Sequence, residues 1–506
     1  MSETLRDVLA QHVARQPRHT FLVAPETGRT LSYGELDRQS RLFARWLRAA
    51  GLRRGDKVGL YLHNSYQTAL LYLGAMIGGY VIAPLNLLSQ RSQLAYVLEH
   101  CDCKVLFTAR EYQKQLGEAL AEVKRPVEVI VIEPDAPELF IEQRLPEGEL
   151  EPIAADDPAL LMYTSGTTGT PKGALLTHRN LVAAARCVAA WHGLAREDRC
   201  LSSLPLYHIN GQVIATVAPF VSGGSVIAPH RFSVSAWWVL AVRHRATWIN
   251  VVPTIIAYLL NAADPTREYR FPRVRFGRSA SAPLPPEQHR AFERKFGIPV
   301  IEAMGMTEAS SVVFCNPQDE AKRKYGSPGI PCGVEAKVID AKTGRALPPG
   351  APGEICLRGA NVMAAYYKSP EQTAKEFDGE GWLRTGDLGY RDADGYYFIT
   401  GRLKELIIKG GENIAPREID EALLKHPAVL EAAAVGVPDP NYGQEILACG
   451  VLKPGARVAV EELRKFCLAE LGRYKTPRQF RFVSELPKGP SGKIQRLRLA
   501  TDAGTA

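Results

Sequence analysis

Residues 163–173 read Tyr-Thr-Ser-Gly-Thr-Thr-Gly-Thr-Pro-Lys-Gly and follow the apolar run 159–162. The glycines leave backbone N–H groups free to converge on one anion, the hydroxyls add donors, and Lys172 adds a positive charge. Such a stretch can also be a plain surface turn, but a surface turn has no need for Pro-Lys-Gly behind a buried strand. We therefore interpret it as a phosphate-binding loop. It is not a Walker loop, which needs Gly-Lys followed by Ser or Thr.

The composition is that of an ordinary globular protein of 506 residues, with 46% hydrophobic and 23% charged residues. This mix excludes disordered, fibrous and disulfide-stapled chains. Lys plus Arg exceed Asp plus Glu by 62 to 54, a net charge of +8, but the charges alternate in sign and form no long basic run. Nucleic acid is therefore not the expected partner, whereas an anionic small molecule fits.

Cysteine usage and the N-terminus predict a cytoplasmic protein. The nine cysteines are scattered, without a Cys-x-x-Cys pair, and the N-terminus lacks the basic and apolar pattern of a secretory signal. The apolar stretch 69–85 approaches the length of a membrane span, but Gly78, Gly79 and Pro84 interrupt it. We interpret it as a buried helix up to residue 77, a glycine turn and a strand over 80–83, so no membrane span is expected.

The pattern of apolar runs predicts an α/β protein. From residue 31 to 201, and again from 225 to 303, short β-branched runs alternate with helical stretches, which is typical of mostly parallel sheets with helices. Residues 327–400 are richer in Gly and Pro and predict an antiparallel sheet or small β-barrel-like subdomain. Beyond residue 402, with a first strand expected at 405–408, the chain predicts a compact α+β module of small-domain size.

The phosphate loop resembles the signature of the adenylate-forming superfamily, which includes acyl-CoA synthetases, luciferases and peptide-synthetase adenylation domains. The resemblance continues in order along nearly the whole chain. It implies an AMP-binding N-terminal domain over 1–402 and a mobile C-terminal domain over 403–506. The further motifs that carry it lie at 205–208, 279–283, 305–308, 382–387, 401–405, 409–413 and 487–493.

The resemblance implies a reaction in which a carboxylate attacks the α-phosphorus of ATP, pyrophosphate leaves, and a thiol then displaces AMP. Two anions must meet, so the site has to neutralise phosphate charge with a metal, cationic side chains and backbone amides. ATP, Mg²⁺ and coenzyme A are the expected cofactors. The residues implied for ATP and AMP are Thr164, Ser165, Gly166, Thr167, Thr168, Gly169, Lys172, Ser281, Ala282, Pro283, Met304, Gly305, Met306, Thr307, Asp387 and Arg402.

Three residues are expected to act in catalysis. Glu308, with Thr167, would hold Mg²⁺, although a Glu at this place in an unknown sequence is more often an acid in the first turn of a helix. Lys493 would bridge the substrate carboxylate and the α-phosphate, although most lysines near a terminus are simply exposed. His208 would line the acyl pocket and gate the thiol tunnel rather than transfer a proton.

Other expectations concern the nucleotide, the hinge and the thiol. Asp387 would accept both ribose hydroxyls, with Arg402 beside it. Met304 stands where relatives usually carry an aromatic that stacks on adenine, and a polarizable Met can still cover a purine face. Lys404 occupies the hinge position. The segment formed by Lys409, Gly410 and Gly411 would line a pantetheine tunnel, which favours free CoA over a carrier-protein thiol.

The acid itself is least defined. Residues 302–310 resemble the oxalate-activating branch, which tends to carry imidazoles where this chain has Asn210 and Ser311. A second carboxylate without a cation opposite it would be buried unpaired at considerable cost. We therefore expect a neutral pocket and a small to medium monocarboxylate. A short dicarboxylate and a carrier-protein thiol stay open as alternatives, and a homodimer is expected. The candidate pocket residues are His208, Asn210, Gly211, Ser279, Met304 and Ser311.

Overall fold

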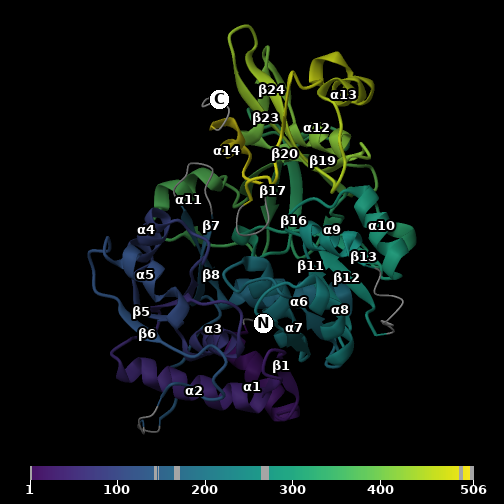
Figure 1. Cartoon of the computed structure of the whole chain (residues 1–506). Coiled ribbons are helices and arrows are strands. Elements are labelled where there is room, and N and C mark those ends of the chain that lie inside the picture. Colours follow the sequence, from purple (N-terminus) through teal and green to yellow (C-terminus); the bar gives the residue numbers. More distant parts are fainter. Residues whose placement is uncertain are drawn as a thin grey trace.

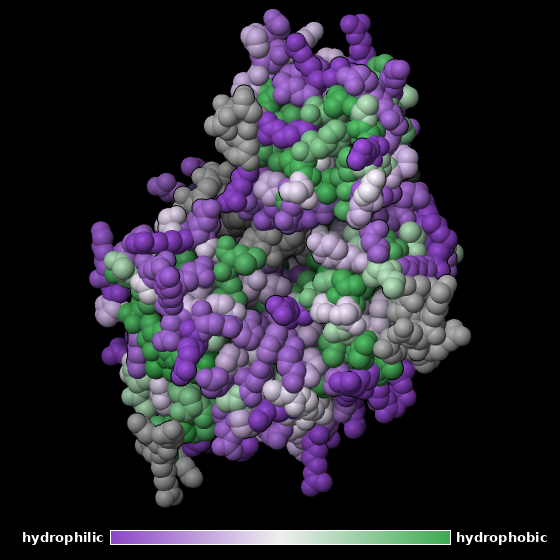
Figure 2. Space-filling model, viewed as in Figure 1, coloured by the Kyte–Doolittle hydropathy of each residue, from purple (hydrophilic) through white to green (hydrophobic). Residues whose placement is uncertain are grey.

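The computed structural model describes residues 3–141, 145, 148–164, 171–263, 273–488 and 494–501. The strands before residue 403 form three sheets, and those after it form a fourth, which lies at the top of Figure 1. On the face drawn in Figure 2, polar and apolar side chains alternate, and the surface is hollowed between the upper and the lower part of the molecule.

The phosphate loop belongs to a seven-stranded sheet with the order β18-β8-β7-β4-β3-β5-β6. Strands β3 to β7 run parallel, whereas β8 returns antiparallel to β7, so the loop joins the two strands of a hairpin. The strands are β3 (Lys57–Tyr61), β4 (Val81–Pro84), β5 (Cys103–Thr108), β6 (Glu128–Val131), β7 (Pro158–Thr164), β8 (Lys172–Thr177) and β18 (Ala365–Tyr366).

A nine-stranded sheet follows the order β15-β14-β13-β12-β11-β9-β10-β1-β2. The strands from β1 to β13 in this order are parallel, so their carboxyl ends share one edge, where ligands bind in open α/β sheets. The strands are β1 (Thr20–Ala24), β2 (Arg29–Ser32), β9 (Arg199–Leu201), β10 (Ser225–Ile227), β11 (Trp248–Val251), β12 (Phe276–Ser279), β13 (Val300–Met304), β14 (Phe314–Cys315) and β15 (Ile330–Pro331).

Helices cover these sheets, and α3 (Tyr66–Gly78) is buried over its whole length. Gly79 ends it in the left-handed region at φ 91°, and β4 follows at Val81, which confirms the predicted helix, turn and strand. Among the described residues, no helix combines the length and apolar character that crossing a membrane requires. The other helices of this part are α1 (Leu5–Arg15), α2 (Tyr33–Ala49), α4 (Arg91–Cys101), α5 (Gln113–Leu120), α6 (His178–His192), α7 (Ala218–Ser222), α8 (Val234–Arg243), α9 (Pro253–Asn261), α10 (Pro286–Phe296) and α11 (Pro370–Glu376).

One large apolar core connects the two sheets. It contains Leu71 of α3, Leu181 of α6, and Trp248 and Phe276 of the nine-stranded sheet. A smaller core lies on the opposite face of that sheet and includes Ile249, Val300 and residues of α8, α9 and α10. The nine-stranded sheet is therefore buried on both faces, as a parallel sheet requires.

The Gly- and Pro-rich region forms an open antiparallel sheet of β16 (Glu335–Ile339), β17 (Gly353–Arg358), β19 (Leu383–Arg391) and β20 (Tyr397–Arg402). The predicted strand at 405–408 is partly wrong, because residues 403–405 form a 3₁₀ turn and the strand begins at Ile407. The last sheet contains β21 (Ile407–Lys409), β22 (Glu412–Ile414), β23 (Val429–Asp439), β24 (Gly443–Leu452) and β25 (Gln479–Phe482), with α12 (Pro416–Leu424), α13 (Val460–Lys475) and α14 (Arg496–Thr501).

Candidate active site

The two ends of the phosphate loop lie opposite each other, because Thr164 and Lys172 are register partners in the β7–β8 hairpin. The predicted loop residues Ser165, Gly166, Thr167, Thr168 and Gly169 lie outside the described residues. The Lys172 ammonium is 3.0 Å from Oε1 of Glu376 and 5.0 Å from the ring centroid of Tyr366. The hairpin therefore fixes a cation at the exit of the loop.

Tyr366 connects this cation to Glu308. Its hydroxyl donates a hydrogen bond of 2.8 Å to Oε1 of the buried Glu308, and its ring faces Lys172. Strand β18 positions it beside Ala174 of β8. The structure thus brings together Lys172 and Glu308, two predicted residues from distant motifs. The sequence analysis missed Tyr366, because nothing in its local pattern separates it from an ordinary strand tyrosine.

Asp387 and Arg402 form the second predicted pair that the structure brings together. They are register partners on β19 and β20, and Arg402 Nε donates to Asp387 Oδ1 at 3.0 Å. Asp387 is buried, and its charge is the main cause of the raised pKa of Arg402, with smaller contributions from Glu405 and Glu308. Because the charge of Glu308 reaches Arg402, the metal and ribose candidates belong to one site.

The segment from Met304 to Ser311 is a tight turn after β13. A Cβ on Gly305 would lie 1.5 Å from the carbonyl oxygen of Ser311, so this position accepts only glycine. The Ser311 amide donates to the Met306 carbonyl at 2.9 Å, and the predicted residue Thr307 begins the 3₁₀ turn that contains Glu308. Met304, half-buried, packs against the main core.

Strained backbone concentrates at this turn and at the loop opposite it. Ser310 and Ser311 have φ values of 48° and 78°, and Ser281 has 76°. Residues other than glycine rarely adopt such values, which cost of order 1 kcal/mol or more and cluster at ligand sites. Ala282 and Pro283 directly follow the strained Ser281, and they carry the chain from β12 toward α10.

Buried amides connect three of the chain segments at the acid pocket. Asn210 donates to the Ser281 hydroxyl at 3.0 Å, and Asn250, at the carboxyl end of β11, donates to the Asn210 carbonyl oxygen at 3.0 Å. Both Asn side chains are buried, and the second oxygen, Oδ1 of Asn250, has no hydrogen-bond partner in the described structure; neither has Oγ of Ser279. Asn250 was missed by the sequence analysis.

The segment that carries His208 and Asn210 is held by close packing. A Cβ on Gly211 would lie 2.4 Å from the carbonyl oxygen of Pro205, so glycine is required there as well. Residues Asn210–Val217 form a π-helix, a geometry that is rare and frequently marks functional sites. His208 is half-buried just before this helix, and its carbonyl accepts the Gln212 amide.

The predicted hinge and thiol residues lie at the start of the C-terminal sheet. Lys404 is part of the 3₁₀ turn that follows Arg402. Lys409 is buried, 2.6 Å from Oε1 of Glu445, and it donates to the Tyr474 carbonyl at 3.1 Å. Gly410 and Gly411 turn the chain from β21 into β22 with φ values of 55° and 86°. Lys493 lies outside the described residues.

Glu302 is a buried acid beside the site that the sequence analysis did not single out. It lies on β13 in register with Ser279, and its Oε1 accepts the Leu284 amide at 3.1 Å. Complete burial raises the pKa of Glu302 to about 7. Its carboxyl group therefore changes charge close to neutral pH.

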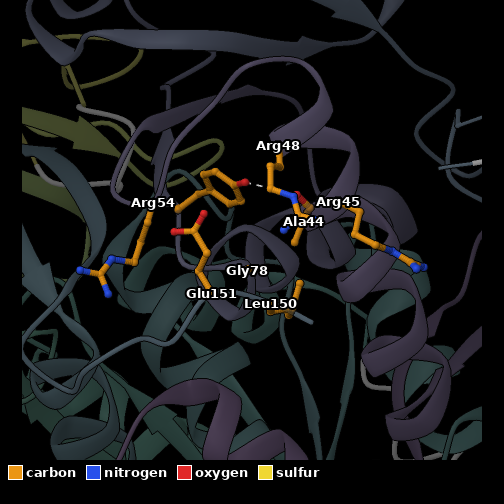
Figure 3. A pocket seen from close by; sticks show the side chains of 8 residues that line it. Ala44, Arg45, Arg48, Arg54, Gly78, Leu150 and Glu151 are labelled. Carbon is orange, nitrogen blue, oxygen red and sulfur yellow. Dashed lines mark hydrogen bonds between the residues drawn. The ribbon is translucent and has the colours of Figure 1, made fainter. Parts of the chain in front are cut away.

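A surface pocket beside α2 lies away from these residues and is lined by Arg45, Arg48, Arg54 and Glu151, among others. Figure 3 shows that the Arg45 and Arg54 guanidinium groups point away from each other, while the Glu151 carboxylate lies between them. The Tyr80 hydroxyl donates to the Ala44 carbonyl at 3.2 Å. Because its cations do not converge, this pocket does not form an anion site.

The fold and the site define an enzyme that activates an acid on a nucleotide. The family model described as AMP-binding enzyme matches residues 9–367, and that of the AMP-binding enzyme C-terminal domain matches 418–493. The chain belongs to this family of AMP-binding enzymes.

The similar proteins are CoA ligases. A sulfoacetate–CoA ligase of Cupriavidus necator is 55% identical over 99% of this chain and 98% of that protein, and an oxalate–CoA ligase of Arabidopsis thaliana is 35% identical over 90% of both. The o-succinylbenzoate–CoA synthetase of Bacillus subtilis, solved with its acyl-adenylate intermediate, has a TM-score of 0.87 at 31% identity and covers 97% of both chains. The protein is a CoA ligase that forms an acyl adenylate from ATP, which confirms the predicted reaction class.

Tyr366→Phe removes the hydroxyl that orients Glu308 and keeps the ring beneath Lys172. We expect the Mg²⁺ concentration for half-maximal AMP formation to rise about tenfold, because groups that orient a metal ligand typically contribute 10- to 100-fold in metal affinity. The neighbouring Tyr367→Phe is the control, since the Tyr367 hydroxyl binds Asp102 instead, at 2.8 Å. Equal Mg²⁺ dependence in the two variants would contradict this role.

Glu302→Gln should flatten the pH dependence of stability. The folded-state pKa of about 7 lies above the unfolded value of 4.5, so the native free energy of unfolding falls as pH rises from about 4.5 to 7 and is level above. The fall is on the order of 3 kcal/mol, from 1.36 kcal/mol per pKa unit. Urea unfolding at pH 5 and pH 8 measures it, and a variant with the native pH dependence would refute the assignment.

Proposed function

We propose that this CoA ligase activates a short acid with one carboxylate and a second, strongly anionic group, and that sulfoacetate is its substrate. The observation that carries the proposal is the network of Asn210, Asn250 and Ser281, in which each amide uses one N–H within the network and keeps a second N–H as a donor, beside the hydroxyl of Ser281. An alkyl chain could not satisfy these groups, and an unmet buried polar group costs about 1 to 3 kcal/mol. The 55% identity to a sulfoacetate–CoA ligase supports the same acid.

The proposed substrate agrees with the predicted monocarboxylate, but it requires a more polar pocket than the neutral one that the sequence predicts. Sulfoacetate carries one carboxylate, which reacts, and a tetrahedral sulfonate, which needs hydrogen-bond donors. The remaining amide N–H groups of Asn210 and Asn250 and the hydroxyl of Ser281 are such donors, whereas the neutral pocket was predicted without Asn250. Oxalate is the second candidate, because the 35% identical relative is an oxalate–CoA ligase. Loading of a carrier-protein thiol remains the less favoured alternative.

In the first half-reaction the site has to neutralise ATP and orient the acid. We assign the phosphates to the loop 165–169 with Lys172, the ribose to Asp387 and Arg402, and the adenine to the turn with Met304. Glu308 is assigned to Mg²⁺: it is buried, Tyr366 fixes one of its oxygens, and a single carboxylate beside nucleotide phosphates is an ordinary Mg²⁺ site. When bound, Mg²⁺ would neutralise charge on the phosphates.

The second half-reaction needs the thiol of CoA at the same adenylate. We propose that the domain beyond residue 402 rotates about Lys404, so that Lys493 serves adenylation and the segment Lys409–Gly411 serves the thiol. The inference is spatial, because both belong to one small module and cannot face one site together. The division into 1–402 and 403–506, a cytoplasmic location and a homodimer are parts of the same proposal. Nine free thiols are consistent with a reducing cytoplasm.

A panel of acids tests the substrate. With ATP, Mg²⁺ and CoA, we expect AMP release with sulfoacetate at a kcat/KM at least 100-fold above that with 3,3-dimethylbutyrate, which has the same shape without the sulfonate charge. Malonate and oxalate complete the panel. Faster turnover of 3,3-dimethylbutyrate would overturn the proposal, and faster turnover of oxalate would favour the second candidate.

Lys493→Ala tests the division of labour. Loss of one preorganised charge donor typically lowers the rate of its step by about 10² to 10³. We expect this loss in acid-dependent AMP formation, whereas conversion of a supplied acyl adenylate to the thioester should stay near the native rate. Lys488→Ala is the control, because its ammonium pairs with Glu431 at 2.6 Å. An equal loss in both half-reactions of Lys493→Ala would contradict the assignment.

A further inference from the structure

Arg278 is a fully buried arginine that pairs with no carboxylate among the described residues; the thiol of Cys315 is one of its neighbours. Its side chain is 0% exposed, and Nε, Nη1 and Nη2 all lack a hydrogen-bond acceptor within the residues that the structure describes. Arginine remains protonated in proteins, so five N–H donors and one positive charge are held inside the fold. Breaking or omitting the partner of a buried charge is strongly unfavourable. Such a group therefore requires an explanation.

Arg278 lies beside the amide network of Asn210 and Asn250. On the parallel strands β11, β12 and β13, Asn250, Arg278 and Ile301 are register partners. Register partners point to the same face of a sheet, so Arg278 lies beside Asn250, which binds Asn210 at 3.0 Å. Arg278 is therefore next to Asn250 on one face of the sheet, and Asn250 belongs to the network that also contains Asn210 and Ser281.

The groups that face the guanidinium supply no negative charge. They are the imidazole of His192 and the thiols of Cys200, Cys315 and Cys332. Burial raises the pKa of Cys200 well above its usual value and that of Cys315 to about 12, while burial and the charge of Arg278 lower the pKa of His192, so these groups are neutral near pH 7. Thiols are weak acceptors, and they cannot replace a carboxylate.

The nearest buried acid on the neighbouring strand does not serve as counter-ion. Glu302 is in register with Ser279, one residue beyond Arg278, and successive side chains of a strand point to opposite faces. Glu302 also binds the Leu284 amide on its own face. Within the described residues no carboxylate pairs with Arg278, so a bound ligand is the source of the anion that we consider.

We propose that Arg278 is the residue that selects the acid, by binding its second anionic group. This inference rests on the proposed function and adds the group that recognises the sulfonate. A planar guanidinium offers paired N–H donors to two oxygens of a sulfonate or a carboxylate, which suits a short dianion held between Arg278 and the reacting carboxylate. An acid without the second charge would leave the guanidinium unpaired in the complex.

On this proposal the pocket carries a positive charge, which differs from the neutral pocket that the sequence predicts. Asn210 and Ser311 do stand where imidazoles were sought, but the cation comes from β12 instead. The sequence motif at 279–283 begins one residue after Arg278, which therefore lies outside it.

The test compares Arg278→Met with the native enzyme on sulfoacetate and 3,3-dimethylbutyrate. In the native enzyme we expect a kcat/KM ratio of at least 100 in favour of sulfoacetate, and in Arg278→Met a fall of that ratio by about 100-fold, since truncating one side of a buried charge pair commonly has effects of this order. Arg275→Met is the matched control: Arg275 is half-exposed and pairs with Asp198 at 2.7 Å, so the ratio should stay native.

Thermal unfolding provides a second readout. Met is apolar and of similar length, so the free Arg278→Met enzyme should melt no lower than the free native enzyme. Sulfoacetate with ATP should raise the melting temperature of the native enzyme more than that of Arg278→Met. If Arg278→Met does not fold, Arg278→Gln, which keeps polarity without charge, is measured for the same ratio.

The outcomes separate the two proposals. A native enzyme that does not prefer sulfoacetate over its neutral isostere overturns the proposed function and the role of Arg278 together. A native enzyme that prefers sulfoacetate, with variants at residue 278 that keep the native ratio, overturns only the role of Arg278. A lost ratio with unchanged ATP KM supports both.

Discussion

Repulsion between a carboxylate and a triphosphate is the constraint on which the arrangement of this site depends. Both reactants are anions, and the α-phosphorus has to be approached along one line. At 4 Å two unit charges interact by about 1 kcal/mol in water and about 4 kcal/mol near a protein surface, so the site must supply fixed positive charge. Lys172 and Arg402 are two cations of the candidate site, and each is paired with a carboxylate, Glu376 or Asp387.

This constraint explains why the site draws on several distant segments. Cations repel one another, so each of them needs an anchor in the fold. The β7–β8 hairpin fixes Lys172, and the register of β19 and β20 fixes Arg402. Tyr366 of β18 lies between Lys172 and Glu308 and contacts both. Glycines and strained serines then allow two stretches of backbone to approach each other closely, at Gly305 and Ser311 and at Gly211 and Pro205. The strain in Ser281 and Ser311 is supported by the buried sheet beneath them.

Much of the fold could be predicted from the sequence, because it depends on local patterns. The buried helix that ends at Gly79 and the alternation of strands and helices follow from apolar periodicity and glycine position. The strand predicted at 405–408 is partly wrong because Leu403–Glu405 form a 3₁₀ turn between β20 and β21, where tertiary position overrides β-propensity. Asp387 and Arg402 could be paired by their motifs, whereas Tyr366 and Asn250 could not, since their roles come only from strand register across sequence-distant neighbours.

Arg278 shows why the specificity of such a site is hard to derive from its loops. A charged residue inside a strand normally indicates an exposed face, yet this strand lies in a sheet that is covered on both faces. If Arg278 has the role proposed for it, the free protein tolerates an unpaired charge in its core, and the acid relieves that charge when it binds. The free enzyme is then less stable than it would be with an apolar residue at position 278. In return, acids that carry a second negative charge bind more tightly than acids that do not. In such a pocket an uncharged isostere leaves a buried group of the protein unpaired. Discrimination against that isostere therefore requires no steric barrier.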